Sequence, residues 1–272
     1  MKKRILAAAV LLPLLFIELY AAPKWVMALT VGIICSLGAY ELLQNTGILR
    51  HGRLTLYSMT AALLMPIWCY FGAPAAWGIL GMVVFVCLVF MEIMLSGMKL
   101  SFSKASICFA AGLLLPYLMS GLVRIMVDPD GRALILIPFV TAFLSDTGGY
   151  FIGCRFGKHR LAPVISPKKS VEGLFGGLVF SVVGMLLYML ILQLGFGYRA
   201  NYAYAVVYGI LGALAGVFGD LCFSVIKRQT GIKDFGDLIP GHGGALDRFD
   251  SILLAAPVVE VLLVLLPVVT KA

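Results

Sequence analysis

Residues 75–95 read AAWGILGMVVFVCLVFMEIML, an apolar run in which Glu92 is the only charged residue. An α-helix rises about 1.5 Å per residue, so about 20 residues cross the roughly 30 Å hydrocarbon core of a bilayer. The run is continuously apolar instead of alternating at every second residue, which favours a helix over a strand of a membrane barrel. The stretch therefore predicts a helix that crosses a lipid bilayer.

Eight further runs have a similar length and composition. Hydrophobic residues make up 61% of the chain and charged residues 12%, whereas soluble chains carry roughly 25% charged residues. The sequence therefore predicts an all-α integral membrane protein, a polytopic helical bundle of about nine transmembrane helices. It excludes a soluble domain, a disordered chain and a disulfide framework. The nine predicted spans are Ile5–Ala22, Trp25–Leu43, Leu54–Phe71, Ala75–Leu95, Ala105–Met126, Ala133–Phe151, Leu174–Phe196, Tyr202–Ile226 and Ile252–Val269.

The first run has an alternative interpretation as a secretory signal peptide. It follows Met1-Lys-Lys-Arg and ends in small residues at Ala21 and Ala22, which is the pattern of such a peptide. Glu18 and Tyr20 interrupt the region where cleavage would occur, and another span follows within a few residues. We therefore interpret the first run as a retained transmembrane helix.

The distribution of lysine and arginine predicts the orientation, because cytoplasmic loops of membrane proteins carry an excess of both. With nine spans and a cytoplasmic N-terminus, sixteen of the 21 lysine and arginine residues fall on the cytoplasmic side. We divide the chain into residues 1–126, which contain five spans, and residues 127–272, which contain four. The second region includes two cytoplasmic loops, at residues 153–173 and 227–251.

Net charge and cysteine usage narrow the classes of function. A net charge of +8 is compatible with nucleic acid, an anionic membrane surface or anionic substrates. Because the basic residues gather in the loops of a membrane protein, we expect the lipid bilayer and anionic substrates as partners, and no nucleic acid. The six cysteines are scattered singly, without C-x-x-C spacing or neighbouring histidines, which excludes the common zinc and redox motifs.

The two longest loops hold nine of the 21 basic residues. Residues 153–173 read GCRFGKHRLAPVISPKKSVEG, and residues 227–251 read KRQTGIKDFGDLIPGHGGALDRFDS. An ordinary pair of positive-inside loops is one interpretation. Topology needs bases alone, however, and these loops interleave them with glycines, prolines and acids. We therefore expect folded loops with a chemical function.

Two acidic residues lie inside predicted spans, Asp146 in the sixth and Asp220 in the eighth. A charged side chain at mid-membrane costs about 2.5–3.5 kcal/mol on insertion scales, so each carboxylate requires a counter-charge, a proton or a metal ion. Asp220, Ser224 and Lys227 follow one another at i, i+4 and i+7, which places them on one face of a helix.

A second acidic pair, Asp247 and Asp250, stands at i, i+3 on the first turn of the ninth span. If the eighth and ninth helices pack together, Asp220 and Asp247 can face each other and share a hard cation. Oxygen ligands without a soft ligand favour Mg²⁺.

The remaining polar residues differ in what they indicate. Glu18, Glu41 and Glu92 lie near span ends, where we expect their carboxylates to reach the lipid headgroups. His242 lies in Pro-Gly-His-Gly-Gly, whose consecutive glycine amides are suited to phosphate oxygens.

The second loop carries the motif Ser224-x-x-Lys227-Arg228-x4-Lys233-Asp234-x-Gly236-x2-Ile239-Pro240-x-His242-Gly243-Gly244-x-x-Asp247-Arg248-x-Asp250. This motif resembles the signature of the phosphatidate cytidylyltransferases, the CDP-diacylglycerol synthases. The first loop resembles the same family at Asp146-Thr-Gly-Gly-Tyr, Gly153, Gly157-Lys158 and Ser166-Pro167-Lys168-Lys169-Ser170-x-Glu172-Gly173. Ala245 and Ser170 are mild departures, because the family usually has a larger aliphatic residue at the first position and often threonine at the second.

The resemblance covers the chain from about Asp146 to its end and implies a reaction. CTP or dCTP and phosphatidic acid would give CDP-diacylglycerol and pyrophosphate, with Mg²⁺ as cofactor and room for a second cation. The implied location is the bacterial cytoplasmic membrane, with the active site on the cytoplasmic side. A homodimer is implied by the resemblance alone.

The resemblance also implies roles for individual residues. Asp220 and Asp247 would be joint ligands of Mg²⁺, with Asp146 and Asp250 as catalytic groups nearby. The basic catalytic residues that would bind the triphosphate and the departing pyrophosphate are Lys227, Arg228, Lys233 and Arg248. The residues expected to bind substrate are Ser166, Lys168, Lys169, Ser224, His242, Gly243 and Gly244.

Two other functions stay open on the sequence. A CTP-dependent kinase of polyprenols or phytol shares the nucleotide and the metal but transfers the γ-phosphoryl group to an alcohol. An ion-coupled transporter would use Asp146 and Asp220 as relay carboxylates. The complete motif argues against the kinase, and a transporter leaves the lysine- and glycine-rich loops unexplained.

Overall fold

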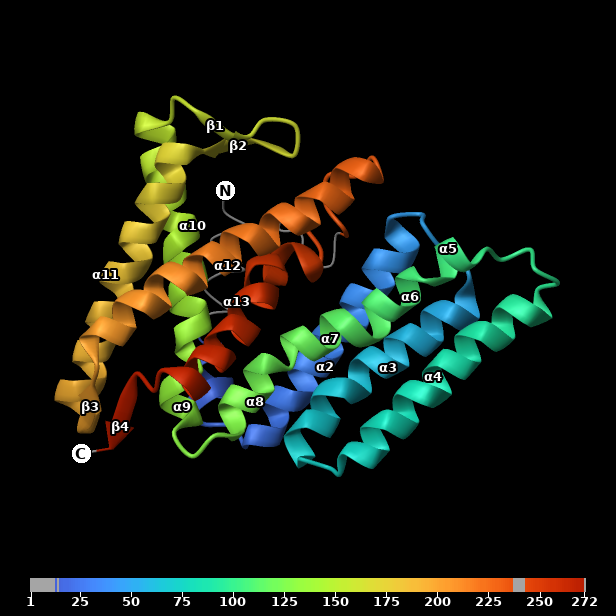
Figure 1. The fold of residues 1–272 in the computed structure, drawn as a ribbon, viewed down its shortest axis with the longest axis horizontal. Helices are drawn as coiled ribbons and strands as arrows, with labels where there is room; N and C mark the ends of the chain where they lie inside the picture. Colours follow the sequence, from blue (N-terminus) through green and yellow to red (C-terminus); the bar gives the residue numbers. More distant parts are fainter. Residues whose placement is uncertain (1–12, 14, 237–242, 272) are drawn as a thin grey trace. The chain divides into compact units, whose positions relative to one another are not determined.

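The structure is a computed structural model that describes residues 13, 15–236 and 243–271 (Figure 1). The chain forms two compact units that do not follow chain order. The first comprises Met1–Pro129 and Lys227–Phe249, and the second comprises Asp130–Ile226 and Asp250–Ala272. All but the last two residues of the second long loop therefore belong to the same unit as the N-terminal helices. The division into residues 1–126 and 127–272 stays a prediction.

Seven helical segments within the described residues are long and apolar enough to cross a membrane. They correspond to the second to eighth predicted spans, and they confirm a polytopic, all-helical membrane protein. Half of the predicted first span, Ile5–Ala22, lies outside the described residues. The seven segments are Lys24–Asn45, Gly52–Phe71, Ala75–Leu95, Phe102–Val127, Gly131–Phe156, Val171–Phe196 and Tyr202–Gln229.

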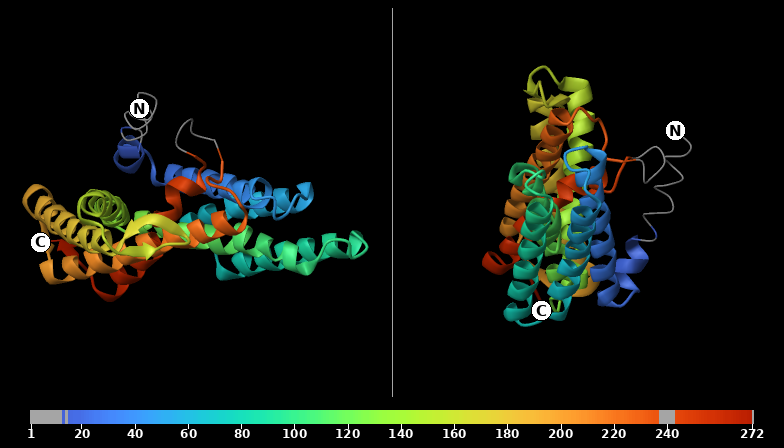
Figure 2. Two further views of the ribbon diagram at one scale, coloured as in Figure 1. Left: turned by 90° about the horizontal axis from the view of Figure 1, so that it is seen from above. Right: turned by 90° about the vertical axis from the view of Figure 1, so that its right-hand side faces the viewer.

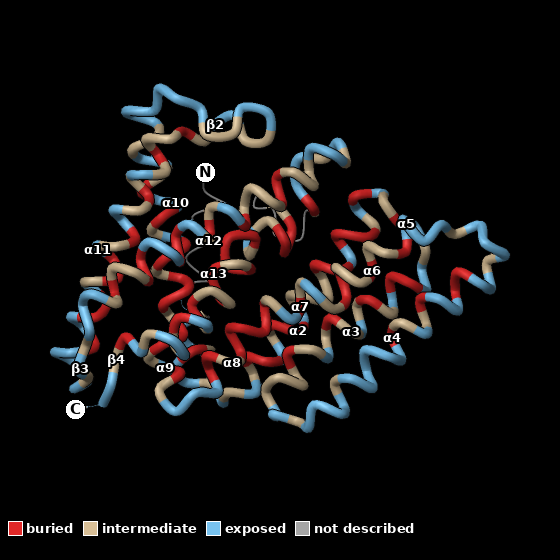
Figure 3. Tube along the Cα trace, in the orientation of Figure 1, coloured by how far each residue is buried: buried red, intermediate tan, exposed pale blue. Residues whose placement is uncertain are grey.

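The first unit is built around two closely packed helices, α2 and α3. The backbones approach so closely that a Cβ atom at Gly32 would lie 2.7 Å from the carbonyl oxygen of Leu63, which is the small-residue packing of membrane helices. Helix α4 packs on α3 and leaves much of its apolar surface exposed (Figure 3), as expected for a helix that faces lipid. The bounds are α2 Lys24–Tyr40, the π-helix η1 Glu41–Asn45, α3 Gly52–Phe71 and α4 Ala75–Leu95.

The next span is interrupted by short irregular segments. Pro116 has no backbone N–H, and its ring crowds the preceding helical turn, so the regular ladder gives way to a π-helix just before it. The predicted span Ala105–Met126 is therefore helical but not uniform. Its segments are α5 Phe102–Ala105, α6 Ile107–Phe109, η2 Ala110–Leu114, α7 Leu115–Met119 and α8 Gly121–Val127.

The second unit packs α10, α11 and α12 through glycines. Helices α10 and α11 lie side by side (Figures 1 and 2), and a Cβ atom at Gly177 would lie 2.6 Å from the carbonyl oxygen of Ser145. On α12, a Cβ atom at Gly212 would lie 2.7 Å from the Thr141 hydroxyl. This close packing fixes the helices that carry Asp146 and Asp220. The bounds are α9 Gly131–Leu134, α10 Leu136–Phe156, α11 Val171–Phe196 and α12 Tyr202–Gln229.

The first long loop is shorter and more ordered than predicted. Helix α10 continues to Phe156, and α11 already begins at Val171, so the loop is confined to residues 157–170 instead of 153–173. Within it, strands β1 (Arg160–Ala162) and β2 (Ser166–Ser170) pair antiparallel. The loop is therefore a hairpin that projects from the ends of two packed helices.

The prediction for the last span was wrong at both ends. Helix α13 runs from Leu246 to Leu265 instead of from Ile252 to Val269. It begins early because acidic residues such as Asp247 stabilise the N-terminal turn of a helix, and it ends before Pro267, which disfavours helical geometry in the residue before it. Beyond it, β4 (Val269–Lys271) pairs antiparallel with β3 (Tyr198–Ala200). Helix α12 likewise continues past its predicted end, to Gln229.

The distribution of lysine and arginine and the position of the β1–β2 hairpin predict a membrane topology that can be tested by labelling. Helix α11 separates β2 from β3 by 26 residues, about 39 Å at about 1.5 Å per residue, so we expect the two ribbons to lie on opposite sides of a bilayer. In a background without native cysteines, we expect Val164→Cys and Asp234→Cys to react with an impermeant thiol reagent only in inside-out vesicles.

The matched control is Arg199→Cys in β3, which we expect to react in intact cells. Val164 is 85% exposed, and Asp234 and Arg199 are exposed as well, so burial would not explain a missing reaction. Labelling of Val164→Cys from the outside of intact cells would contradict the topology.

Candidate active site

A pocket of about 280 Å³ opens in the second unit, where the hairpin meets α10, α11 and α12. Four residues predicted from the sequence line it: Asp146 on α10, and Ser166, Lys168 and Lys169 on β2. The pairing of β1 with β2 is what brings the two lysines back over the end of α10. One side of the predicted site is thus assembled within a single unit.

Asp220 is held by an ion pair with the hairpin. Its Oδ2 atom lies 2.6 Å from Lys169 Nζ, and its Oδ1 atom accepts a hydrogen bond from the Ser224 hydroxyl at 3.2 Å. Lys169 also attracts the carboxylate of Asp146, which is repelled by Asp220. Apart from the ion pair, the buried Lys169 ammonium has no hydrogen-bond partner within the described residues. It therefore keeps N–H donors for an anionic ligand.

Ser251 connects the other two predicted acids of this unit, and sequence reasoning missed it. Its hydroxyl donates to Asp146 Oδ2 at 3.3 Å, while its backbone N–H donates to Asp250 Oδ1 at 2.8 Å. Asp250 and Ser251 are buried, at 9% and 5% exposure. Asp250 therefore acts on Asp146 through a serine, and the only signal in the sequence was a hydroxyl next to a motif aspartate.

Glu172 and Ser170 anchor the hairpin to α11. The Glu172 carboxylate accepts the N–H groups of Lys158 and His159, at 3.1 and 3.2 Å, and lies 2.6 Å from His159 Nδ1. The Ser170 hydroxyl caps α11 by accepting the N–H of Gly173 at 3.1 Å. These motif residues hold the loop in place, which leaves its lysines free to face the pocket.

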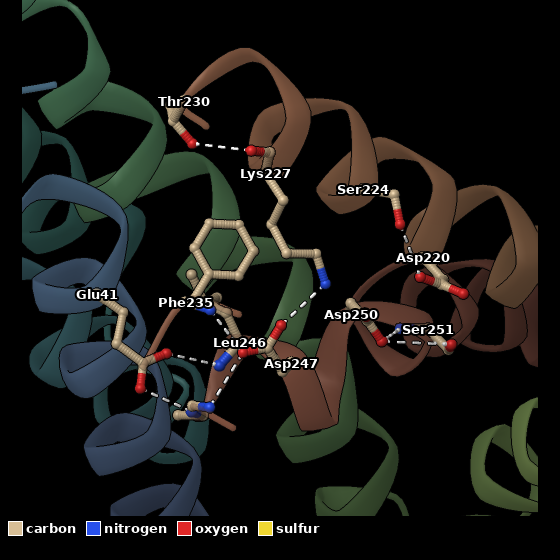
Figure 4. A network of polar contacts seen from close by, with 12 residues as sticks. Glu41, Asp220, Ser224, Lys227, Thr230, Phe235, Leu246, Asp247, Asp250 and Ser251 are labelled. Atoms are coloured by element: carbon tan, nitrogen blue, oxygen red, sulfur yellow. Dashed lines mark hydrogen bonds and ion pairs between the residues drawn. The ribbon is translucent and has the colours of Figure 1, made fainter. Parts of the chain in front are cut away.

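In the first unit, Asp247 lies at the centre of a polar network (Figure 4). Lys227 Nζ donates to its Oδ1 atom at 2.9 Å, and the side chains are only 12% and 4% exposed. Its Oδ2 atom accepts the backbone N–H groups of Phe235 at 2.7 Å and Gly244 at 3.0 Å. Asp247 thus joins the end of α12, the loop and the start of α13.

The expectation for two of the span-end glutamates was wrong. Glu41 and Glu92 are 4% and 6% exposed, and their carboxylates bind protein donors instead of lipid headgroups. Glu92 accepts from Tyr57 at 3.2 Å and lies 3.5 Å from Arg53 Nη1. Glu41 accepts the backbone N–H groups at the start of α13. Hydropathy alone could not distinguish a carboxylate that binds protein from one that reaches headgroups.

The remaining predicted residues fall into two groups. Arg228, Lys233 and Arg248 belong to the first unit and are exposed, where they can meet a charged substrate in water. His242 lies outside the described residues. Gly243 has a φ of +84°, which a residue with a side chain rarely adopts, and the Gly244 N–H is occupied by Asp247.

The oxygen atoms around Asp220 and around Asp247 suit a hard divalent cation as ligands. Carboxylate and hydroxyl oxygens are the ligands that Mg²⁺ prefers, and Asp220 has the Ser224 oxygen beside it and a second acid, Asp146, close enough to repel it. Among the described residues, no three acidic, histidine or cysteine side chains form a ready metal cluster. Asp220 and Asp247 are each neutralised by a lysine of their own unit, so a cation would take over a charge that a lysine now supplies.

The chain is similar to known proteins over most of its length. The chain matches the cytidylyltransferase family over residues 2–266. It is 35% identical to phosphatidate cytidylyltransferase of Pseudomonas aeruginosa over 277 residues, which cover 97% of each chain. It is also 36% identical to phosphatidate cytidylyltransferase of Staphylococcus epidermidis over 185 residues, 68% of each chain.

The buried ion pair between Lys227 and Asp247 predicts a measurable effect on stability. Lys227→Met leaves a buried carboxylate without its counter-charge, which typically costs about 3–5 kcal/mol. We expect the midpoint of thermal unfolding in detergent to fall, by on the order of 10 °C. Arg228→Met is the matched control, because it removes the same charge from the next, exposed residue, and we expect a shift of less than about 2 °C.

The double variant Lys227→Met/Asp247→Asn should regain part of the lost stability, because the uncompensated charge is gone. Equal shifts for Lys227→Met and Arg228→Met, or no recovery in the double variant, would show that the pair contributes nothing particular to the fold.

Proposed function

The chain belongs to the cytidylyltransferase family, and from this membership we propose that it is a phosphatidate cytidylyltransferase. It is a nucleotidyltransferase and a multi-pass membrane protein. The observation that carries the proposal is the pairing of a motif aspartate with a lysine in each unit, Asp220 of α12 with Lys169 of the hairpin and Asp247 of α13 with Lys227. Acids and bases in this arrangement suit a reaction between two polyanions.

The proposed reaction transfers CMP from CTP, or dCTP, to phosphatidic acid. A phosphate oxygen of the lipid forms a bond to the α-phosphorus of the nucleotide, and the bond from this phosphorus to the β-phosphate oxygen breaks. Pyrophosphate leaves with the bonding electrons, and CDP-diacylglycerol remains in the bilayer. The lipid phosphate is already an anion near pH 7, so the attack needs no general base. The main barrier is the repulsion between the two substrates, which positive groups lower by positioning and by charge stabilisation.

The basic groups of the first unit suit the nucleotide. Arg228, Lys233 and Arg248 are exposed and would bind the triphosphate and then the departing pyrophosphate. Arginine binds phosphate oxygens with two parallel N–H groups, which adds geometric selectivity to charge. Lys227 would join them by releasing Asp247 as the substrate binds.

The pocket of the second unit suits the lipid phosphate. Lys168, Lys169 and Ser166 line it on the hairpin, and Asp146 lines it from within the membrane-spanning helix α10. A ligand there would keep its acyl chains in the hydrocarbon while its phosphate meets the lysines. We place this side of the membrane in the cytoplasm, where CTP is available, and the membrane itself is proposed to be the bacterial cytoplasmic membrane. A homodimer rests on the family resemblance alone.

Asp220 and Asp247 are proposed to hold Mg²⁺ together, with Asp146 and Asp250 nearby and room for a second cation. When bound, the ion supplies positive charge to the attacking and leaving phosphate oxygens. The residues themselves set the positions: Ser224 orients Asp220, and the N–H groups of Phe235 and Gly244 orient Asp247. Ser251 holds Asp146 and Asp250 in register.

The position of a radioactive label tests the reaction and separates it from a lipid kinase. We expect purified protein with phosphatidic acid and Mg²⁺ to move label into the lipid fraction from [α-³²P]CTP and not from [γ-³²P]CTP. A kinase would do the opposite with an alcohol such as a polyprenol.

Heat-denatured protein and protein without phosphatidic acid are the controls. Failure to form a labelled CDP-lipid from [α-³²P]CTP, across several detergents and Mg²⁺ concentrations, would contradict the proposed function.

A further inference from the structure

The short π-helix η1, at the end of α2, contacts the motif loop, the segment that connects α12 to α13. About 200 residues separate η1 from this loop in sequence. Glu41, the first residue of η1, accepts the N–H of Ala245 at 2.8 Å and the N–H of Leu246 at 2.9 Å. Asn45, its last residue, donates from Nδ2 to the carbonyl oxygen of Phe235 at 2.7 Å. Figure 4 shows the Glu41 carboxylate directed at the start of α13. All of these residues belong to the first unit.

The Glu41 carboxylate is compensated by backbone groups and by no ion pair within the described residues. It is 4% exposed, so its charge is costly unless donors satisfy it. The first N–H groups of a helix have no partner inside the helix and carry the positive end of its dipole. Glu41 therefore provides, from another helix, the cap that α13 lacks in its own sequence.

Together, Glu41 and Asp247 occupy three consecutive amides. Gly244 donates to Asp247, and Ala245 and Leu246 donate to Glu41. Asp247 lies one residue after the amides that Glu41 holds, and its Oδ2 atom also accepts the N–H of Phe235. Any movement of the helix start would move Asp247 and Arg248 with it.

Two glycines of the loop leave room for the Glu41 carboxylate. A Cβ atom at Gly244 would collide with the Glu41 carboxyl group, and one at Gly236 would lie 2.9 Å from Glu41 Oε1. Two motif glycines thus leave the space that Glu41 fills. The π-helix adds a second indication, because single π-turns within α-helices occur frequently at functional sites.

We propose that Glu41 is a positioning residue for nucleotidyl transfer: it fixes the N-terminus of α13 and thereby the placement of Asp247 and Arg248. This inference rests on the proposed function of the loop. It adds an N-terminal helix to a site that the motif confines to the second half of the chain. The side chain does not touch substrate, so it acts through the backbone it holds.

The test compares Glu41→Gln with Glu92→Gln, a matched control that neutralises another buried glutamate of the same unit. Glutamine keeps one acceptor oxygen but turns an NH₂ group toward the second amide. We expect Glu41→Gln to lower kcat about 100-fold, the order of loss produced by misplacing a reacting group by about 1 Å. We also expect it to raise the Mg²⁺ concentration for half-maximal rate, while Glu92→Gln changes neither by more than about threefold.

Hydrogen exchange gives a readout that does not depend on activity. In substrate-free protein, amides 245 and 246 should exchange at least about tenfold faster in Glu41→Gln than in the wild type. If the wild type made no CDP-lipid, the proposed function would fail while this measurement still tested the contact. Should Glu41→Gln not fold, Asn45→Ala releases the Phe235 carbonyl and should shift the rate and the Mg²⁺ requirement in the same direction, by a smaller factor.

Two results would overturn the proposal. One is wild-type exchange at amides 245 and 246 in Glu41→Gln. The other is a loss of rate that matches the loss of folded protein, with the Mg²⁺ requirement unchanged, because a merely structural residue would behave in that way.

Discussion

An acid within or beside a membrane must be compensated, and this constraint organises both units of the protein. Asp220 lies inside the membrane-spanning helix α12, and Asp247 lies in the first turn of α13, and an uncompensated carboxylate is expensive in such surroundings. Each is paired with a lysine that a loop or helix end brings to it, Lys169 at 2.6 Å and Lys227 at 2.9 Å. Glu172 holds the hairpin that carries Lys169, and the N–H groups of Phe235 and Gly244 hold Asp247 beside Lys227.

In the proposed function, the pairing would couple the binding of anions to the binding of a cation. A phosphate that takes Lys169 or Lys227 leaves a carboxylate without its counter-charge, and a divalent ion restores the balance. Conversely, an ion on the carboxylates frees the lysines for phosphate. By linkage, each ligand therefore favours the other. Acid–lysine pairs of this kind suit the joining of two polyanions in a low-dielectric surrounding.

The sequence predicted the membrane-spanning helices well, because continuous apolar runs of fixed length have one solution in a bilayer. It failed where local chemistry overrides hydropathy. The ninth span begins six residues early because Asp247 and Asp250 are favourable in the first turns of α13, and it ends early at Pro267. The motif identified Asp247 but not the backbone amides that hold it. Glu41 was assigned to the headgroups because nothing in its own neighbourhood indicates a partner about 200 residues away.

The claim on which the rest depends is that Asp220 and Asp247 serve one cation. The most direct measurement is the binding of Mn²⁺, as a paramagnetic substitute for Mg²⁺, followed by electron paramagnetic resonance in purified protein with and without CTP. We expect tight binding that CTP strengthens, and we expect both Asp220→Asn and Asp247→Asn to weaken it by about 100-fold or more. The matched control Asp234→Asn, at an exposed acid of the same loop, should bind as the wild type does. Wild-type affinity in either single variant would contradict a shared ion.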